Sequence, residues 1–299
     1  MFYLLSLFTG MIISIMVASN GGLTSQYGLY SATVLIHIIG LIAITILVFI
    51  NKDKILHKRQ AWYLYTPGLI GVFTVIFTNF AFFRISVSSI MALGLLGQCV
   101  AGVIIDHFGL MKMPKCPFVK QKLIGITFIV VGIASMINSF EVVAVIFAFS
   151  AGITVIVSRT LNANLAEATS IQTSTFYNYV MGLLGALIAL LLLGRGELYY
   201  IQVDFAASTG NWFFYIGGIL GLISVSISNF VVKKVSAFYF TLLLFIGQIV
   251  AGLIIDIVLT GEFNLLNVIG GILVTLGLSI DLVLEKRRVS PAASSLPPQ

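Results

Sequence analysis

Ten apolar stretches of about twenty residues follow one another along the chain, separated by short polar segments. A helix of about twenty residues crosses a hydrocarbon layer about 30 Å thick, because each residue rises 1.5 Å. The predicted spans are 2–20, 28–50, 62–83, 85–109, 120–138, 141–161, 171–194, 211–232, 235–260 and 264–284. Only 9% of residues are charged, against about a quarter in ordinary globular domains. The chain is therefore predicted to be an all-α polytopic membrane protein.

Lysine and arginine gather in alternate connections. They are Lys52, Lys54, Lys58 and Arg59, then Lys112, Lys115, Lys120 and Lys122, then Lys233 and Lys234, and finally Lys286, Arg287 and Arg288. Because short loops rich in these residues stay cytoplasmic, both termini are expected inside a bacterial inner (plasma) membrane. The net charge of +6 then reflects topology and contact with anionic lipid headgroups, and it does not indicate nucleic-acid binding.

A ten-residue phrase occurs twice, as GQCVAGVIID at 97–106 and GQIVAGLIID at 247–256. The alignment extends to 79–106 and 229–256, and upstream Asn20 and Gly40 align with Asn162 and Gly182. Each half holds five spans, and an odd number inverts the second copy, as in many secondary transporters. We therefore predict inverted repeats at 1–139 and 140–288. The tail at 289–299, rich in Pro, Ser and Ala, is predicted to be disordered.

The repeated "GQxVAGxIID", the "NxxL" that closes the first span of each half, and the five-plus-five arrangement carry a family resemblance. The chain resembles the drug/metabolite transporter superfamily, in its YdcZ-like branch, with two units fused. The resemblance implies a carrier for small metabolites that works by alternating access. It also implies a central cavity lined by the first four spans of each half, with the fifth spans outside. Related units often place a Gln four residues before the Asn, where this chain has Met16 and Ser158.

Within the phrase, spacing separates two roles. Gly97 and Ala101, with their copies, form a small-xxx-small pair that favours close packing of another helix. Gln98 and Asp106 lie on a neighbouring stripe about 12 Å apart along the axis, with Gln98 near mid-membrane. With the copies Gln248 and Asp256, the stripes suggest a central substrate site and two pathways leading from it. The alternatives are helix-to-helix bonds for the glutamines and helix-end capping for the aspartates.

Other polar residues lie within the predicted spans. The additional candidate substrate-binding residues are His37, Asn178, Tyr179, Asn20, Asn162 and Arg159. His37 could carry a coupling proton or be a neutral, hydrogen-bonded packing residue. Arg159 could anchor a carboxylate or phosphate entering from the cytoplasm, or extend to the headgroups.

Several chemistries are missing from the sequence. No GxxxxGK[ST] loop cradles ATP phosphates, and no zinc-ligand spacing or Gly-x-Ser-x-Gly elbow occurs. We therefore expect no enzyme, no cofactor and no metal, and a gradient or the cargo itself must supply the energy. The favoured function is a secondary-active carrier of a small molecule. A lipid-intermediate flippase and a non-transporting receptor or scaffold stay open, as does the choice between a monomer and a homodimer in the bilayer.

Overall fold

The computed structural model describes residues 1–53, 55, 60–112, 120–137, 141–197, 211–231 and 237–293. Within these ranges the regular structure is entirely helical. The first half contains α1 (Phe2–Tyr27), α2 (Leu29–Asn51), η1 (Trp62–Tyr65), α3 (Pro67–Phe82), α4 (Val87–Phe108), η2 (Leu110–Lys112) and α5 (Lys122–Met136). The second contains α6 (Val142–Ala168), α7 (Ile171–Leu193), η3 (Arg195–Glu197), η4 (Trp212–Ile216), α9 (Gly217–Val231), α10 (Ala237–Thr260) and α11 (Leu265–Ala293).

These helices occupy the positions of the ten predicted spans and confirm the all-α polytopic class. Eight are long and apolar enough to cross a membrane, whereas the segments Lys122–Met136 and Trp212–Ser228 are shorter apolar helices. α11 continues through Ala293, so the described part of the tail that was predicted to be disordered is helical. Residues 294–299 and the predicted repeat boundary at 139–140 lie outside the described residues.

Local sequence sets the helix ends. The Ser86 side chain accepts a bond from the Ser89 amide at the start of α4, and Ser170 does the same for Thr173 in α7. Gly28 alone joins α1 to α2 and has a φ of 85°, a value that glycine adopts at little cost. α1 and α2 are therefore consecutive helices joined by one sharp turn.

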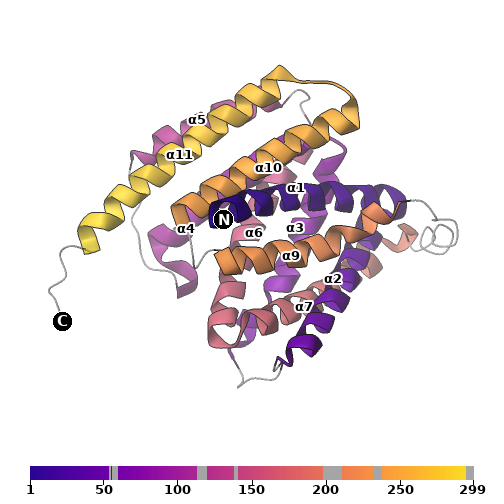
Figure 1. Ribbon diagram of the computed structural model, residues 1–299. Coiled ribbons are helices and arrows are strands. Elements are labelled where there is room, and N and C mark those ends of the chain that lie inside the picture. The colour runs from indigo at the N-terminus through magenta and orange to yellow at the C-terminus, as the bar shows by residue number, and fades with distance from the viewer. Residues whose placement is uncertain are drawn as a thin grey trace.

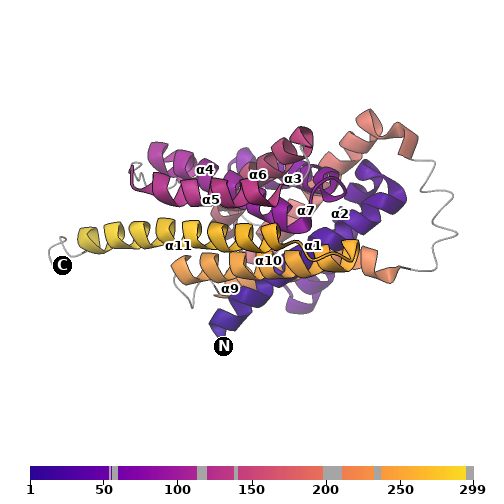
Figure 2. The ribbon, with the colours of Figure 1, turned by 90° about the horizontal axis from the view of Figure 1, so that it is seen from above.

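The two halves are interleaved rather than side by side. α1 packs mainly on α10 and α9 of the second half, and α6 packs mainly on α3 and α4 of the first. α5 and α11 pair along their length at one edge of the molecule (Figures 1 and 2). This is the arrangement that the family resemblance implied, with the fifth helix of each half outside.

Glycine in the repeated phrase lets helices meet at the backbone. A Cβ added to Gly97 would collide with the carbonyl oxygen of Phe149 in α6. One added to Gly247 would collide with the carbonyl oxygen of Leu7 in α1. The small-xxx-small prediction is confirmed, and the partner of each copy is the first helix of the other half.

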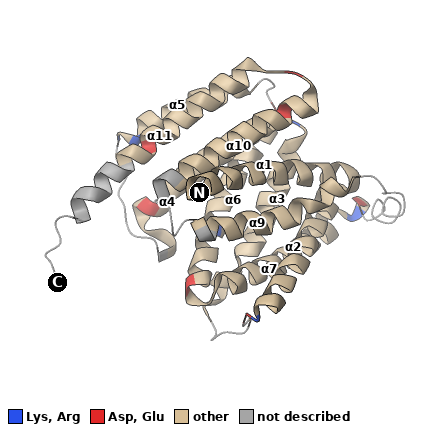
Figure 3. Ribbon diagram, in the orientation of Figure 1, with Lys and Arg blue, Asp and Glu red and all other residues tan. Residues whose placement is uncertain are grey.

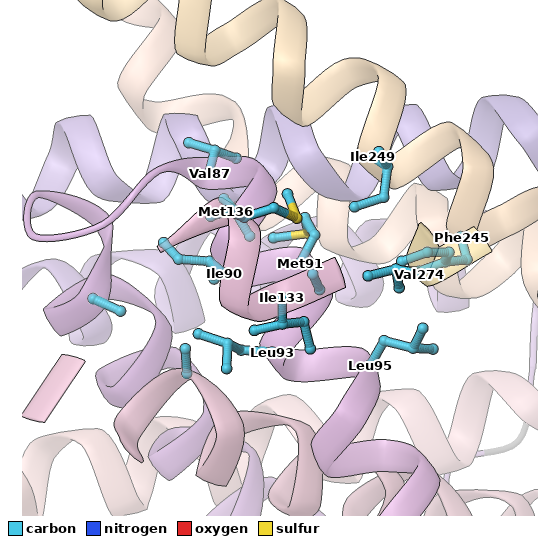
Figure 4. Close-up of a cluster of buried hydrophobic side chains, with 14 of the residues drawn as sticks. Val87, Ile90, Met91, Leu93, Leu95, Ile133, Met136, Phe245, Ile249 and Val274 are labelled. Carbon is cyan, nitrogen blue, oxygen red and sulfur yellow. The ribbon is translucent and has the colours of Figure 1, made fainter. Parts of the chain in front are cut away.

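The largest apolar cluster lies where α4 meets α5, α10 and α11. Figure 4 shows Met91, Ile133 and Met136 pointing toward one another, with Phe245 and Val274 beside them. Burial of such side chains contributes about 1.5–3 kcal/mol each in water-soluble proteins, but inside a bilayer close packing takes over much of that role. The α5–α11 pair is thereby fixed to the rest of the molecule through α4 and α10.

Charged residues lie mostly at the helix ends and in the connections (Figure 3). The contacts between ends agree with alternating helix directions, since the end of α10 lies against the start of α4. Several of the lysines and arginines used to predict orientation lie outside the described residues, namely Lys54, Lys58, Arg59, Lys115, Lys233 and Lys234. We therefore refer below to the predicted outer end and the predicted cytoplasmic end.

Candidate functional site

His37 of α2 and Tyr179 of α7 meet where the two halves cross. Their rings make an edge-to-face contact with centroids 6.2 Å apart. A Cβ added to Gly182 would collide with the His37 ring, and one added to Gly40 would collide with the Tyr179 ring. Since His37 aligns with Tyr179 and Gly40 with Gly182, the contact is reciprocal. It marks a pseudo-two-fold axis between the repeats.

Both of these side chains are also tied to backbone oxygens. His37 Nδ1 lies 2.7 Å from the carbonyl oxygen of Thr33 one turn earlier, and the His37 side chain is buried. The Tyr179 hydroxyl donates to the carbonyl oxygen of Gly218 in α9 at 3.2 Å. The pair therefore links α2, α7 and α9 near the axis.

The two glutamines of the repeated phrase lie at the two helix crossings. The Gln98 amide group donates to the Gly94 carbonyl oxygen of its own helix at 3.3 Å, and a Cβ on Gly152 of α6 would lie 2.9 Å from the Gln98 backbone nitrogen. Gln248 is buried, and its backbone nitrogen would lie 2.8 Å from a Cβ on Gly10 of α1. Each glutamine thus adjoins the first helix of the opposite half.

Asparagines of the "NxxL" pattern differ in their partners. Asn162 Nδ2 donates to Asn178 Oδ1 at 2.9 Å, and the Ser174 hydroxyl donates to the Asn162 carbonyl oxygen at 2.8 Å. Asn20 is buried, and among the described residues its Oδ1 has no hydrogen-bond partner; that oxygen fills the space beside Gly217. The polar cluster on α6 and α7 therefore has no matching cluster on α1 and α2.

Arg159 lies one turn before Asn162 on α6. The Arg159 side chain is exposed, although α6 packs against α3, α4 and α7. Asn162 is half-buried nearby, so the two residues mark an accessible polar surface on α6.

At the predicted outer end, aromatic side chains cover the end of α1. The Phe82 ring from α3 occupies the space over Gly21, and the Phe214 ring from η4 occupies the space over Gly22. The Tyr27 and Tyr215 hydroxyls share a hydrogen bond. Aromatic rings from α3 and η4 therefore cover this end of α1.

Asp256 joins α10 to the start of α4. Its carboxylate accepts bonds from the backbone amides of Val87 at 2.6 Å and Ser88 at 3.1 Å, and from the Ser88 hydroxyl. These amides are two of the orphan donors at a helix N-terminus, where a negative charge is favoured. Beside it is a cavity of about 190 Å³ lined also by Glu262 and Asn267. Asp106, at the opposite end of α4, is half-buried.

The candidate residues thus form separate groups. His37 contacts Tyr179, Asn162 contacts Asn178, and the glutamines lie at the helix crossings. The expectation that one central cavity is shared by five of them stays a prediction; these are Gln98, Gln248, His37, Asn178 and Tyr179. Among the described residues, no group of three or more His, Cys, Asp or Glu side chains could hold a metal ion.

Sequence reasoning missed two features of the helix ends. Glu197 of η3 accepts bonds from the first three amides of α2, those of Leu29, Tyr30 and Ser31, at 2.8–3.0 Å. It also missed that η1 and η4 are themselves a repeat. The segments 62–65 and 212–215, WYLY and WFFY, align at the same spacing as the ten-residue phrase. Extending the alignment upstream would have found the repeat of η1 and η4. No local sequence pattern predicts the contact between Glu197 and the start of α2.

Two interleaved sets of five closely packed, apolar helices define a multi-pass membrane protein. A family model described as "Putative inner membrane exporter, YdcZ" matches residues 1–135 and again residues 143–280. The chain therefore belongs to this family of inner-membrane proteins, as its repeated phrase indicated.

Similarity to solved structures supports the fold. A protein described only as "Crystal structure of protein" superposes with a TM-score of 0.58 at 15% sequence identity, covering 95% of this chain and 97% of the other. At that identity the match supports the fold alone. A search of curated proteins gave no match.

Proposed function

We propose that the protein is a secondary-active carrier that moves a small metabolite across the inner membrane by alternating access. The described conformation is then the inward-facing one, with both termini cytoplasmic. Family membership supports transport in general, and the asymmetry between the repeats supports the mechanism. Inverted repeats that adopt two different conformations can exchange them, and this exchange moves access from one side to the other.

One observation carries the proposal. Val17 of α1 aligns with Arg159 of α6, and Gly21 aligns with Ala163. Val17 and Gly21 on α1 are buried, with Val17 only 4% exposed. Their counterparts on α6, Arg159 and Ala163, are both exposed. Equivalent surfaces are thus covered in one half and accessible in the other. A protein with a single symmetric packing would show the same exposure in both.

The test compares single cysteines at Val17 and Ala163 in a background with Cys99→Ser and Cys116→Ser. A membrane-impermeant maleimide is applied to right-side-out and inside-out vesicles, and the labelling rates are measured. We expect Ala163→Cys to react from the cytoplasmic side and Val17→Cys to react slowly from both sides. Equal rates at the two positions would contradict the inward-facing assignment.

A third substitution tests whether the two accessibilities are linked. Phe82→Ala removes the ring over Gly21, so it should raise labelling of Val17→Cys from outside and lower labelling of Ala163→Cys from inside. Leu184→Ala, at an exposed position on α7, serves as the control that removes a large side chain without touching either stripe. If Phe82→Ala raises both rates together, the ring only packs the outer end and alternating access is wrong.

A further inference from the structure

Arg159 is a permanent cation without a described anionic partner. Guanidinium groups stay protonated in proteins, and a charge within a membrane protein is normally paired or faces a water-filled space. Among the residues that the structure describes, no ion pair joins Arg159 to a carboxylate. The exposed Arg159 side chain is therefore available to an anion that reaches this surface of α6.

The polar surface around Arg159 is specific to the second repeat. At the equivalent positions the first repeat has Val17 for Arg159, Ala32 for Ser174 and Ile36 for Asn178. A feature needed only to pack a duplicated fold would be expected in both copies, as Gly97 and Gly247 are. The three polar side chains on α6 and α7 therefore suggest a ligand that meets only one half of the carrier.

The described hydrogen bonds in this cluster occupy acceptor oxygens. Asn178 Oδ1 accepts a bond from the Asn162 amide group at 2.9 Å, and the Asn178 NH₂ group has no described partner. The Ser174 hydroxyl donates its hydrogen bond to the Asn162 carbonyl oxygen. Arg159 adds five N–H donors in a planar fork that fits two oxygens at once. Free donors and positive charge select an acceptor-rich, negatively charged group.

We propose that Arg159 and Asn178 bind an oxyanion group, a carboxylate or phosphate, of the transported metabolite at its cytoplasmic entrance. This inference rests on the proposed function and names its substrate class. Arg159 makes the bidentate contact, and Asn178 donates a further bond that fixes orientation. Asn162 is a positioning residue, since it holds the Asn178 amide without touching the ligand.

The experiment measures thermal unfolding of the purified protein in a neutral detergent at constant ionic strength. The probes are butyrate and methyl phosphate as soluble oxyanions, butanamide as the neutral match of butyrate, butylammonium as the cation, and short-chain phosphatidylglycerol as an anionic lipid. A ligand that binds the folded state raises the unfolding temperature. We expect at least one soluble oxyanion to raise it, with no shift from butanamide or butylammonium.

Variants assign the effect to the site. Arg159→Gln should weaken apparent oxyanion binding at least tenfold, and Arg159→Lys should keep part of it. Arg195→Gln, an exposed arginine on η3, is the matched control and should bind as the wild type does. If Arg159→Gln does not fold, Asn178→Ile replaces it, because isoleucine already occupies this position in the first repeat. The proposal is overturned if no soluble oxyanion shifts the wild type, or if Arg159→Gln and Asn178→Ile bind as well as wild type.

The probe set separates this inference from the proposed function. If only phosphatidylglycerol shifts the wild type and Arg159→Gln abolishes the shift, the oxyanion belongs to a lipid and the soluble metabolite is wrong. If butanamide or butylammonium binds instead, the proposed oxyanion ligand is wrong. The proposed carrier function is not contradicted by that result. The labelling of Val17→Cys and Ala163→Cys decides the carrier without reference to ligand charge.

Discussion

His37 and Tyr179 occupy equivalent positions in the two repeats, and their rings contact each other edge to face at the pseudo-two-fold axis. Each ring fills the space left by a glycine on the opposite helix, at Gly182 and Gly40. Two equivalent residues that contact each other across an axis must both pack well in a single geometry. Here the two copies have diverged into different rings while the glycines have stayed.

The first prediction concerns Gly40. Gly40→Ala places a methyl group against the Tyr179 ring, whose hydroxyl is held by the Gly218 carbonyl oxygen and so resists displacement. We expect a loss of about 1–3 kcal/mol in the free energy of unfolding, measured as a lower unfolding temperature in detergent. Gly71→Ala is the control, because its methyl group meets only the Ser158 hydroxyl, at 3.8 Å. Equal stability of the two variants would contradict the reciprocal packing.

The second prediction concerns the repeated phrase. Gly97→Ala and Gly247→Ala place a methyl group against backbone carbonyls, which cannot rotate away as a side chain can. Each should therefore destabilise the protein more than Gly40→Ala does, and each should lower the yield of folded protein. Gly94→Ala on the same face of α4 meets its nearest atom at an ordinary 3.9 Å and should be tolerated. Folded, wild-type-like Gly97→Ala protein would show that α4 and α6 do not approach as described.

The phrase also shows what sequence could and could not predict. Its glycine spacing predicted a close helix contact, because small residues four apart have few other uses in a membrane helix. It could not name the partner, since α4 packs on α6 and α10 packs on α1, across the two repeats. Pairings of this kind depend on the three-dimensional crossing and leave no period in the sequence.

Ends of helices were harder to predict than their middles. The Asp256 carboxylate could be predicted to cap a helix, but the helix that it caps is α4, 168 residues earlier in the chain at Ser88. Glu197 caps α2 from a connection on the other half of the molecule. The difference between the exposed Ala163 and the buried Gly21 lay beyond prediction as well. Under the proposed alternating access, one sequence encodes both conformations, so it cannot specify which of them is observed.

The third prediction concerns His37, for which the sequence left two roles open. The ring lies against Gly182, and its Nδ1 is held by the Thr33 carbonyl oxygen, which favours packing over proton transfer. We expect His37→Gln to keep the wild-type pH dependence of Ala163→Cys labelling between about pH 5.5 and about pH 8. His107→Gln, on a histidine at the end of α4, is the matched control. A response that flattens in His37→Gln alone would assign the coupling proton to His37.

The last prediction concerns Asp256, whose carboxylate holds the end of α10 against the start of α4 through three donors. Asp256→Asn has one acceptor oxygen in place of two and loses the negative charge that the N-terminus of α4 favours. The unfolding free energy should fall by about 1–3 kcal/mol, and Ser88→Ala, which removes one donor, should cost less. Glu262→Gln lines the same cavity from an exposed position and should leave the unfolding temperature unchanged. If Asp256→Asn unfolds at the wild-type temperature, the contact does not stabilise the predicted outer end. Asp256 would then be free to act as the pathway residue that its place in the repeated phrase suggested.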